Sequence, residues 1–168
     1  MLNEKVDCNY IANKIVERCI KSPLILTAKR LNKLVLLVNI AYAKQHNEFV
    51  VKNDYFLWPS GFVIPKIYYK YSNNGNSAKC CKVEEKTQQD YEKDINPKLK
   101  IKIEKIIDKI LEITNYIDTI DLIDVLRVDI VEDENTVIYQ EEIIDIYKNF
   151  NFKVLEELNR QEKQYFNN

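Results

Sequence analysis

Few side chains in this sequence combine the types and the spacing that catalysis requires. The chain contains one histidine, His46, within Lys-Gln-His-Asn-Glu at positions 44–48. A catalytic histidine needs a reacting or orienting partner within hydrogen-bond distance, and a histidine near a helix end is already favoured by the helix dipole. The sequence also lacks a glycine-rich phosphate loop, a nucleophile elbow and a His-Glu-x-x-His motif. We therefore expect a protein that is not an enzyme and that needs no cofactor.

The four cysteines do not have the spacing of a metal site. Cys80 and Cys81 are adjacent in a polar segment, and no Cys-x-x-Cys pair occurs. Cys8 and Cys19 fall on a predicted helix, where we expect small buried hydrophobic residues. The sequence begins Met-Leu-Asn-Glu-Lys with no apolar leader after it, and no apolar run reaches the roughly 20 residues of a membrane span. These features predict a cytoplasmic protein with reduced thiols, no metal and no membrane segment.

Carboxylates are concentrated in one part of the chain. Residues 1–82 contain thirteen Lys and Arg against five Asp and Glu, whereas residues 83–168 contain twelve against twenty-one. This asymmetry indicates either a charged partner or two halves that pack together and neutralise each other. Between Ile117 and Asp145 there is one cation, Arg127, among ten carboxylates: Asp118, Asp121, Asp124, Asp129, Glu132, Asp133, Glu134, Glu141, Glu142 and Asp145.

A calcium site is a second interpretation of part of that segment. Asp129, Glu132, Asp133 and Glu134 lack the alternate spacing and the glycine of an EF-hand loop. A solvated acidic turn is the more frequent explanation for such a run, so we predict no ion there.

The elements that must position these residues are predicted to be mainly helical. Thr27 is a favourable N-cap residue. The run that follows it is apolar on nearly all faces and continues for about five turns without Gly or Pro, which predicts a buried central helix over Thr27–His46. In particular, we expect Leu34, Val35 and Val38 to be buried. The length suits one compact, mainly helical domain over residues 1–168, with a small β-hairpin or short sheet.

Short β-prone runs follow the central helix. Phe49–Val51 and Tyr55–Leu57 flank three polar residues, which predicts a hairpin between them. Gly61 is one of two glycines in the chain and predicts a tight turn. Pro65 predicts the first turn of a new helix. We expect Trp58 to anchor the core with its N–H hydrogen-bonded.

Capping residues predict the helices on either side. Asp7 begins a helix over Cys8–Ile20, and Asn96 with Pro97 opens a long helix whose apolar stripe extends to Ile117. Asp118 or Thr119 begins the next, short helix.

Two more helices, one strand and one loop are predicted in the remaining parts of the chain. A helix over Glu141–Phe150 follows, and Asn151 caps the last one. Thr136–Tyr139 is a strand that can pair with Tyr55–Trp58. The polar segment at about 72–96 is predicted to be a mobile loop, with a short helix near its end.

Two motifs lie in the first half of the chain. The first, Thr-x-x-x-Leu-x-Lys-Leu, is formed by Thr27, Leu31, Lys33 and Leu34. The second, Trp-x-x-Gly-x-Val-x-Pro-x-x-Tyr, is formed by Trp58, Gly61, Val63, Pro65 and Tyr68. Together they resemble the Panacea antitoxin domain, the SocA-like family of phage-associated proteins. The resemblance covers roughly residues 7–71 and continues more faintly over residues 101–150.

The resemblance implies a mostly helical cytoplasmic domain that binds and neutralises a paired protein toxin. Some members look like adaptors that deliver the toxin to a protease. This sequence has Ala28 and Phe62 where the family usually has proline. It has Leu126 and Arg127 where the family has a Thr-His pair, and no Trp follows them.

Four functions are compatible with these observations. The first is an antitoxin-type protein whose partner is a cognate toxin, encoded in the adjacent reading frame. The second is a proteolytic adaptor, and the third is an orphan phage or host interaction protein with the same fold. The fourth, a nucleic-acid binder that uses Lys29, Arg30 and Lys33, is disfavoured because the acidic half would repel phosphate.

For the first function, the partner-binding residues are predicted to lie in two places. We expect contacts through Asp121, Asp124 and Asp129 in the acidic segment, and through Tyr69 and Lys70 beside the second motif. The motif residues themselves are predicted to be structural.

Overall fold

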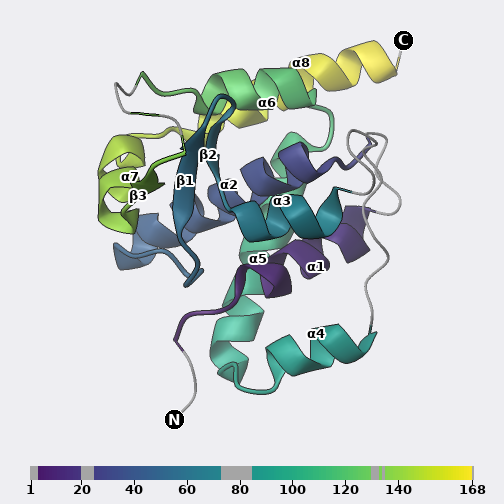
Figure 1. The fold of residues 1–168 in the computed structure, drawn as a ribbon. Helices are drawn as coiled ribbons and strands as arrows, with labels where there is room; N and C mark the ends of the chain where they lie inside the picture. Colours follow the sequence, from purple (N-terminus) through teal and green to yellow (C-terminus); the bar gives the residue numbers. More distant parts are fainter. Residues whose placement is uncertain (1–3, 20–24, 73–84, 130–132, 134, 168) are drawn as a thin grey trace.

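The computed structural model describes residues 4–19, 25–72, 85–129, 133 and 135–167, which form eight helices and one small sheet. The helices are α1 (Cys8–Cys19), α2 (Ala28–His46), α3 (Pro65–Tyr71), α4 (Glu85–Glu92), α5 (Pro97–Thr114), α6 (Thr119–Leu126), α7 (Gln140–Tyr147) and α8 (Phe152–Phe166). The strands are β1 (Tyr55–Trp58), β2 (Gly61–Val63) and β3 (Val137–Ile138). The mainly helical fold class is therefore as predicted. In Figure 1, α8 and α6 lie at one end of the molecule and α4 at the other.

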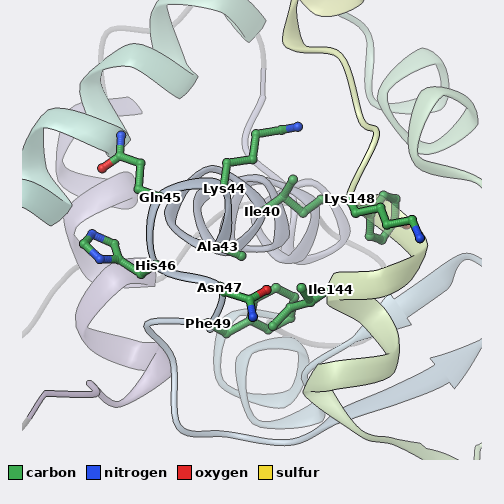
Figure 2. A pocket seen from close by; sticks show the side chains of 10 residues that line it. Ile40, Ala43, Lys44, Gln45, His46, Asn47, Phe49, Ile144 and Lys148 are labelled. Carbon is green, nitrogen blue, oxygen red and sulfur yellow. The ribbon is translucent and has the colours of Figure 1, made fainter.

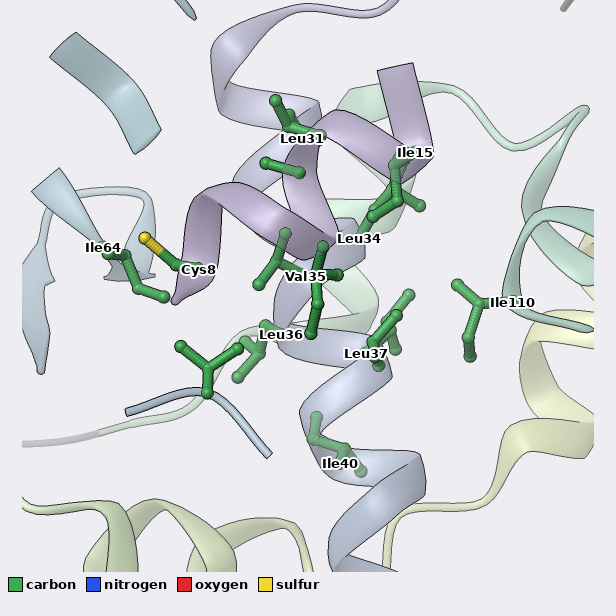
Figure 3. Packing of buried hydrophobic residues seen from close by; sticks show 14 of the residues in the cluster. Cys8, Ile15, Leu31, Leu34, Val35, Leu36, Leu37, Ile40, Ile64 and Ile110 are labelled. Atoms are coloured by element: carbon green, nitrogen blue, oxygen red, sulfur yellow. The ribbon is translucent and has the colours of Figure 1, made fainter. Parts of the chain in front are cut away.

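The predicted central helix is α2. The Thr27 hydroxyl accepts a hydrogen bond from the Arg30 amide at 2.9 Å, as expected of an N-cap. Every residue from Arg30 to Ile40 is buried, including the three apolar residues for which burial was predicted. Because α2 contacts α1, α3, α5, α6, α7 and β2, it touches most other elements. Figure 3 shows its apolar side chains among those of α1 and α5, such as Ile15 and Ile110.

The other helix starts agree with the predicted caps. Carboxylate or amide oxygens of Asp7, Asn96, Asp118 and Asn151 each accept a backbone N–H two residues further on. Each of these short polar side chains satisfies a donor that the first helical turn leaves free. Caps are local chemistry, which is why the sequence predicts them well.

The hairpin prediction was wrong in its position. Strand β1 pairs antiparallel with β2, with Trp58 opposite Gly61 across a Pro59-Ser60 turn. The earlier run, Phe49–Val51, is buried but does not pair with β1. Instead, Val51 forms a parallel bridge with Val6: the Val6 amide donates to the Val50 carbonyl, and the Val6 carbonyl accepts from the Lys52 amide. Local β-propensity could not distinguish this distant partner from the nearby one.

The second strand prediction was correct. Strand β3 pairs antiparallel with β1, with Tyr55 opposite Ile138, and gives the sheet order β2-β1-β3. The backbone of Asn135, at φ 65°, donates to the carbonyl of Leu57 next to this pair.

The end of the predicted loop is ordered by contact with α1. Residues 73–84 lie outside the described part of the chain. The short helix expected near its end is α4, where the Tyr91 hydroxyl accepts from the Asn9 amide at 3.1 Å. Lys14 of α1 pairs with Glu92 at 2.9 Å, and Ile95 is buried.

Ion pairs of this kind show where the two halves of the chain neutralise each other. Arg18 of α1 pairs with Asp108 of α5 at 2.7 Å, and it also lies 3.8 Å from Glu104. Neutralisation between the halves therefore occurs along α1, α4 and α5. No helix in the described residues has the length and hydropathy that crossing a membrane requires.

Candidate functional site

Lys33 of the first motif and three residues of the second, Trp58, Val63 and Tyr68, line one small cavity, which we call the Lys33 pocket. Its volume is about 230 Å³, and it lies between α2, the β1–β2 turn and α3. It is lined by Lys29, Asn32, Lys33, Trp58, Pro59, Ser60, Val63 and Tyr68. The sequence predicted these motif residues to be structural and did not predict a cavity between them.

Lys33 is the unusual residue of this pocket because its charged group is buried. The side chain is 1% exposed, and its Nζ donates to the Phe62 carbonyl at 3.1 Å. No carboxylate pairs with it among the residues that the structure describes. Burial, reinforced by the charge of Lys29, lowers the pKa of Lys33 from 10.5 to about 8. The group is thus mostly an ammonium at neutral pH, in surroundings that disfavour its charge.

Gly61 leaves room for this ammonium. Its φ is +107°, a conformation that side chains rarely adopt, as the predicted tight turn required. A Cβ at this position would lie 3.0 Å from the Lys33 Nζ. The glycine of the motif therefore serves both the backbone conformation and the close approach of Lys33.

Asn32, the residue before Lys33 on α2, forms a hydrogen bond with the residue that follows β2. Its Oδ1 accepts from the Ile64 amide at 2.8 Å, and its side chain is 1% exposed. Lys33 donates to the carbonyl of Phe62 in β2. Two consecutive residues of α2 therefore hydrogen-bond the backbone of β2 and of Ile64, which follows it. Val63, which lies between the two anchored residues, lines the pocket.

The rim of the pocket is aromatic. The Trp58 ring lies edge-on to Tyr68 and to Tyr69, at centroid distances of 5.2 and 6.2 Å. Trp58 is half-buried, with its indole N–H donated to Asn135 at 3.2 Å. The expected N–H bond is present, but the predicted core position is wrong, because Trp58 is half-buried and packs against the half-buried Tyr68 and the exposed Tyr69 rather than inside the apolar core.

The two predicted contact residues beside the motif differ in exposure. Tyr69 is 71% exposed. Lys70 is half-buried. Its Nζ lies over the ring of Tyr91, 5.2 Å from the centroid, and over the ring of Tyr71, at 5.6 Å. Of the pair, Tyr69 presents the larger free surface.

Arg30 has a structural role that the sequence did not predict. It is 4% exposed and donates to the carbonyls of Thr114 and Ile117 at 2.8 and 2.6 Å. These carbonyls lie at and just after the end of α5, where a cation also complements the helix dipole. Because Arg30 and Lys33 are buried, the surface suggested for nucleic-acid binding retains only Lys29 as an exposed cation.

A larger cavity, of about 680 Å³, lies between the end of α2 and α7. Figure 2 shows His46 on one side of this cavity and Ile144 and Lys148 on the other. The His46 ring lies 4.3 Å from the Tyr42 ring, and its Nε2 is 2.9 Å from the Lys102 Nζ. The lining residues include no carboxylate that could orient the imidazole. His46 is the last residue of α2, where the helix dipole favours a cation.

The described carboxylates of the acidic segment lie on α6, on α7 and at Asp118, Asp129 and Asp133 beside them, and we call this set of side chains the acidic surface. Its exposed or half-exposed carboxylates in the described residues are Asp118, Asp121, Asp124, Asp129, Asp133, Glu141, Glu142 and Asp145. Two of them have ion-pair partners there: Asp124 with Arg127 at 3.1 Å, and Asp145 with Lys148 at 3.3 Å. Glu132 and Glu134 lie outside the described residues.

A hydrogen bond connects α6 and α7 at Leu126, one of the two residues at which the sequence departs from the Thr-His pair of the resembled family. Leu126 is buried, and its carbonyl accepts from the Tyr147 hydroxyl of α7 at 2.6 Å. Arg127 is exposed and ends α6. Apolar side chains are exposed on the same elements, with Ile120 and Tyr139 each at 69%.

The cysteines and carboxylates provide no metal site in the described part of the chain, where no three potential ligands gather. Cys8 is buried, which raises the pKa of its thiol to about 12, and Cys19 is half-buried. Cys80 and Cys81 lie outside the described residues.

Comparison of the chain with models of known protein families, with curated proteins and with solved structures found no match.

Proposed function

We propose that this protein is an antitoxin-type protein, which binds a basic protein toxin and neutralises it without catalysing a reaction. The motif resemblance suggests a toxin as the partner. The observation that carries the proposal is the acidic surface: a set of carboxylates on α6 and α7 that the rest of the described chain leaves largely unpaired.

Two physical properties of this surface suit a protein partner. Exposed carboxylates of one sign steer a basic partner toward the surface and raise the association rate. The exposed side chains of Ile120 and Tyr139 lie on the same elements and offer apolar area that a partner can bury. A toxin that acts on RNA or nucleotides needs a positive substrate surface, and an acidic protein can cover it.

The direct test is co-expression with the product of the adjacent reading frame, followed by binding kinetics on the purified pair. The triple variant Asp121→Lys, Asp124→Lys, Asp129→Lys should slow association, on the order of tenfold, and flatten its dependence on salt. Far-UV circular dichroism should show the fold retained, because Asp124 and Asp129 are exposed and Asp121 is half-exposed.

A matched control separates local complementarity from net charge. Glu48→Lys, Asp54→Lys, Asp94→Lys changes the same number of exposed carboxylates outside the acidic surface. This control should associate much faster than the first variant. The proposal fails if the adjacent product is harmless alone, or if both triple variants bind it at the same rate.

A further inference from the structure

The Lys33 ammonium has hydrogen-bonding capacity that the protein does not use. An ammonium has three N–H donors, and the Phe62 carbonyl accepts one of them at 3.1 Å. Among the residues that the structure describes, no second acceptor and no carboxylate is paired with it. Lys33 also lines the cavity, so these two uncommitted donors belong to a residue that borders it.

The other lining residues indicate which group would fit. Trp58, Val63 and Tyr68 provide apolar walls, and Lys29 adds a second positive charge from the same helix. The Ser60 hydroxyl provides a further donor. The amide of Asn32 is already engaged with Ile64 and Ala28. A carboxylate on a short apolar stem therefore matches both the charge and the walls.

The size of the cavity favours a side chain over a metabolite. Sites for small molecules usually enclose about 300–1,000 Å³, whereas this cavity has about 230 Å³. Tyr69, 71% exposed beside the rim, adds aromatic surface of the kind enriched at protein interfaces. Phosphate is a poorer match, because such anions are often held by arginine forks, and no arginine lines the pocket.

We propose that the Lys33 pocket binds the side-chain carboxylate of a glutamate or aspartate presented by a protein partner. The carboxylate accepts hydrogen bonds from the Lys33 ammonium and supplies the counter-ion that the described part of the chain lacks, while its methylene stem packs against Trp58 and Tyr68. The inference concerns residues separate from the acidic surface and does not rest on the proposed function.

Trp58 makes the pocket directly observable, because it is the only tryptophan in the chain. We would titrate the protein with acetyl-Ala-Glu-Ala-amide, with its Gln counterpart and with inorganic phosphate, all at constant ionic strength. The Glu peptide should change the Trp58 fluorescence saturably, with a Kd on the order of millimolar for so few contacts. The Gln peptide should bind at least tenfold more weakly.

Variants and pH then identify the ammonium as the receptor. Lys33→Met should abolish the response to the Glu peptide, while Lys93→Met, at an exposed lysine, should keep it. In the wild type, affinity for the Glu peptide should fall about tenfold per pH unit above the pKa of Lys33, and affinity for the Gln peptide should stay constant. The other titratable groups beside the ammonium are Lys29 and the Tyr68 phenol; the β1–β2 turn has none.

The pH series keeps the test decisive if Lys33→Met disturbs the turn, since it uses the unaltered protein. Equal affinity for the two peptides, or affinity for the Glu peptide that is independent of pH, would overturn the proposal. Tighter binding of phosphate than of the Glu peptide would also overturn it, by assigning the pocket to phosphoryl groups.

Discussion

The buried charge of Lys33 predicts an unusual dependence of stability on pH. In an unfolded chain this lysine has its ordinary pKa of 10.5, whereas in the folded protein burial lowers the pKa to about 8. Between these values the unfolded state binds more protons than the folded state. The free energy of unfolding therefore rises with pH in this range, because stability increases wherever the unfolded state holds the extra proton.

The two pKa values set the size of the effect. At about 1.36 kcal/mol per pKa unit, the full difference corresponds to roughly 3 kcal/mol. Between about pH 7 and pH 10 the folded protein should gain about 2.5 kcal/mol from Lys33 alone. The side chain is 1% exposed, so screening by solvent does little to reduce this value.

Comparison with Lys33→Met isolates this contribution from other titrations. Buried tyrosines such as Tyr55 and Tyr147, whose pKa values burial raises, act in the opposite direction at high pH. They are present in both proteins and cancel in the difference. Urea unfolding, followed by far-UV circular dichroism in the presence of a reductant, would be measured for both proteins at both pH values. Lys93→Met is the control and should follow the wild type.

The expected result is a stability difference between wild type and Lys33→Met that shifts by about 2.5 kcal/mol in favour of the wild type as the pH rises. Both the ammonium and the neutral amine of Lys33 can donate to Phe62, so the energy of that hydrogen bond cancels in this double difference. A double difference near zero would show that the ammonium is solvated, and the burial on which the pocket argument depends would be refuted.

Two further substitutions test the residues that build the pocket and its support. Gly61→Val should lower stability by about 1 kcal/mol or more, because its φ of +107° strains any side chain; an unchanged melting temperature would contradict this. Asn39→Ala should cost more than about 2 kcal/mol, because the buried Asn39 accepts from the Val50 and Val51 amides and donates to the Tyr55 hydroxyl. Asn149→Ala, at an exposed asparagine, is its control, and equal unfolding midpoints for these two variants would refute the role of Asn39.

The sequence predicted best what depends on neighbours in the chain. The caps at Thr27, Asn96 and Asn151 were correct because a short polar side chain and the next amide groups are sufficient to form them. The apolar period of α2 was correct for the same reason: burial follows from spacing along one helix. Pro65 likewise starts α3, where its missing N–H leaves no bond unmade.

What could not be predicted depends on partners far along the chain. Phe49–Val51 looked like a strand of a local hairpin, but its backbone pairs with Val6 and with the side chain of Asn39. Trp58 looked like a core residue, but it lies on the rim of a cavity against Tyr68. Neither partner leaves a signal in the local pattern of the sequence.

The pocket itself was missed because its charged residue occurs in an apolar helix. Polar residues interrupt the α2 run at Asn32, Lys33 and Asn39, and that interruption was the available signal. A polar residue on a helix with no exposed face must either bond a backbone group elsewhere or remain unsatisfied. The interruptions therefore indicate anchoring points, although the anchored segments cannot be identified without the fold.

The contrast between the two buried cations of α2 separates anchoring from ligand binding. Arg30 donates to two carbonyls near the end of α5 and lies 3.4 Å from the Thr119 hydroxyl, so several of its N–H donors are used within the fold. It also lies where the dipole of α5 favours a cation. Lys33 donates to one carbonyl, faces no such dipole in the β1–β2 turn, and borders a cavity. Anchoring to Phe62 uses one of the three N–H donors of the Lys33 ammonium. The proposed carboxylate would use the other two and would neutralise a buried charge that has no carboxylate partner in the described part of the chain.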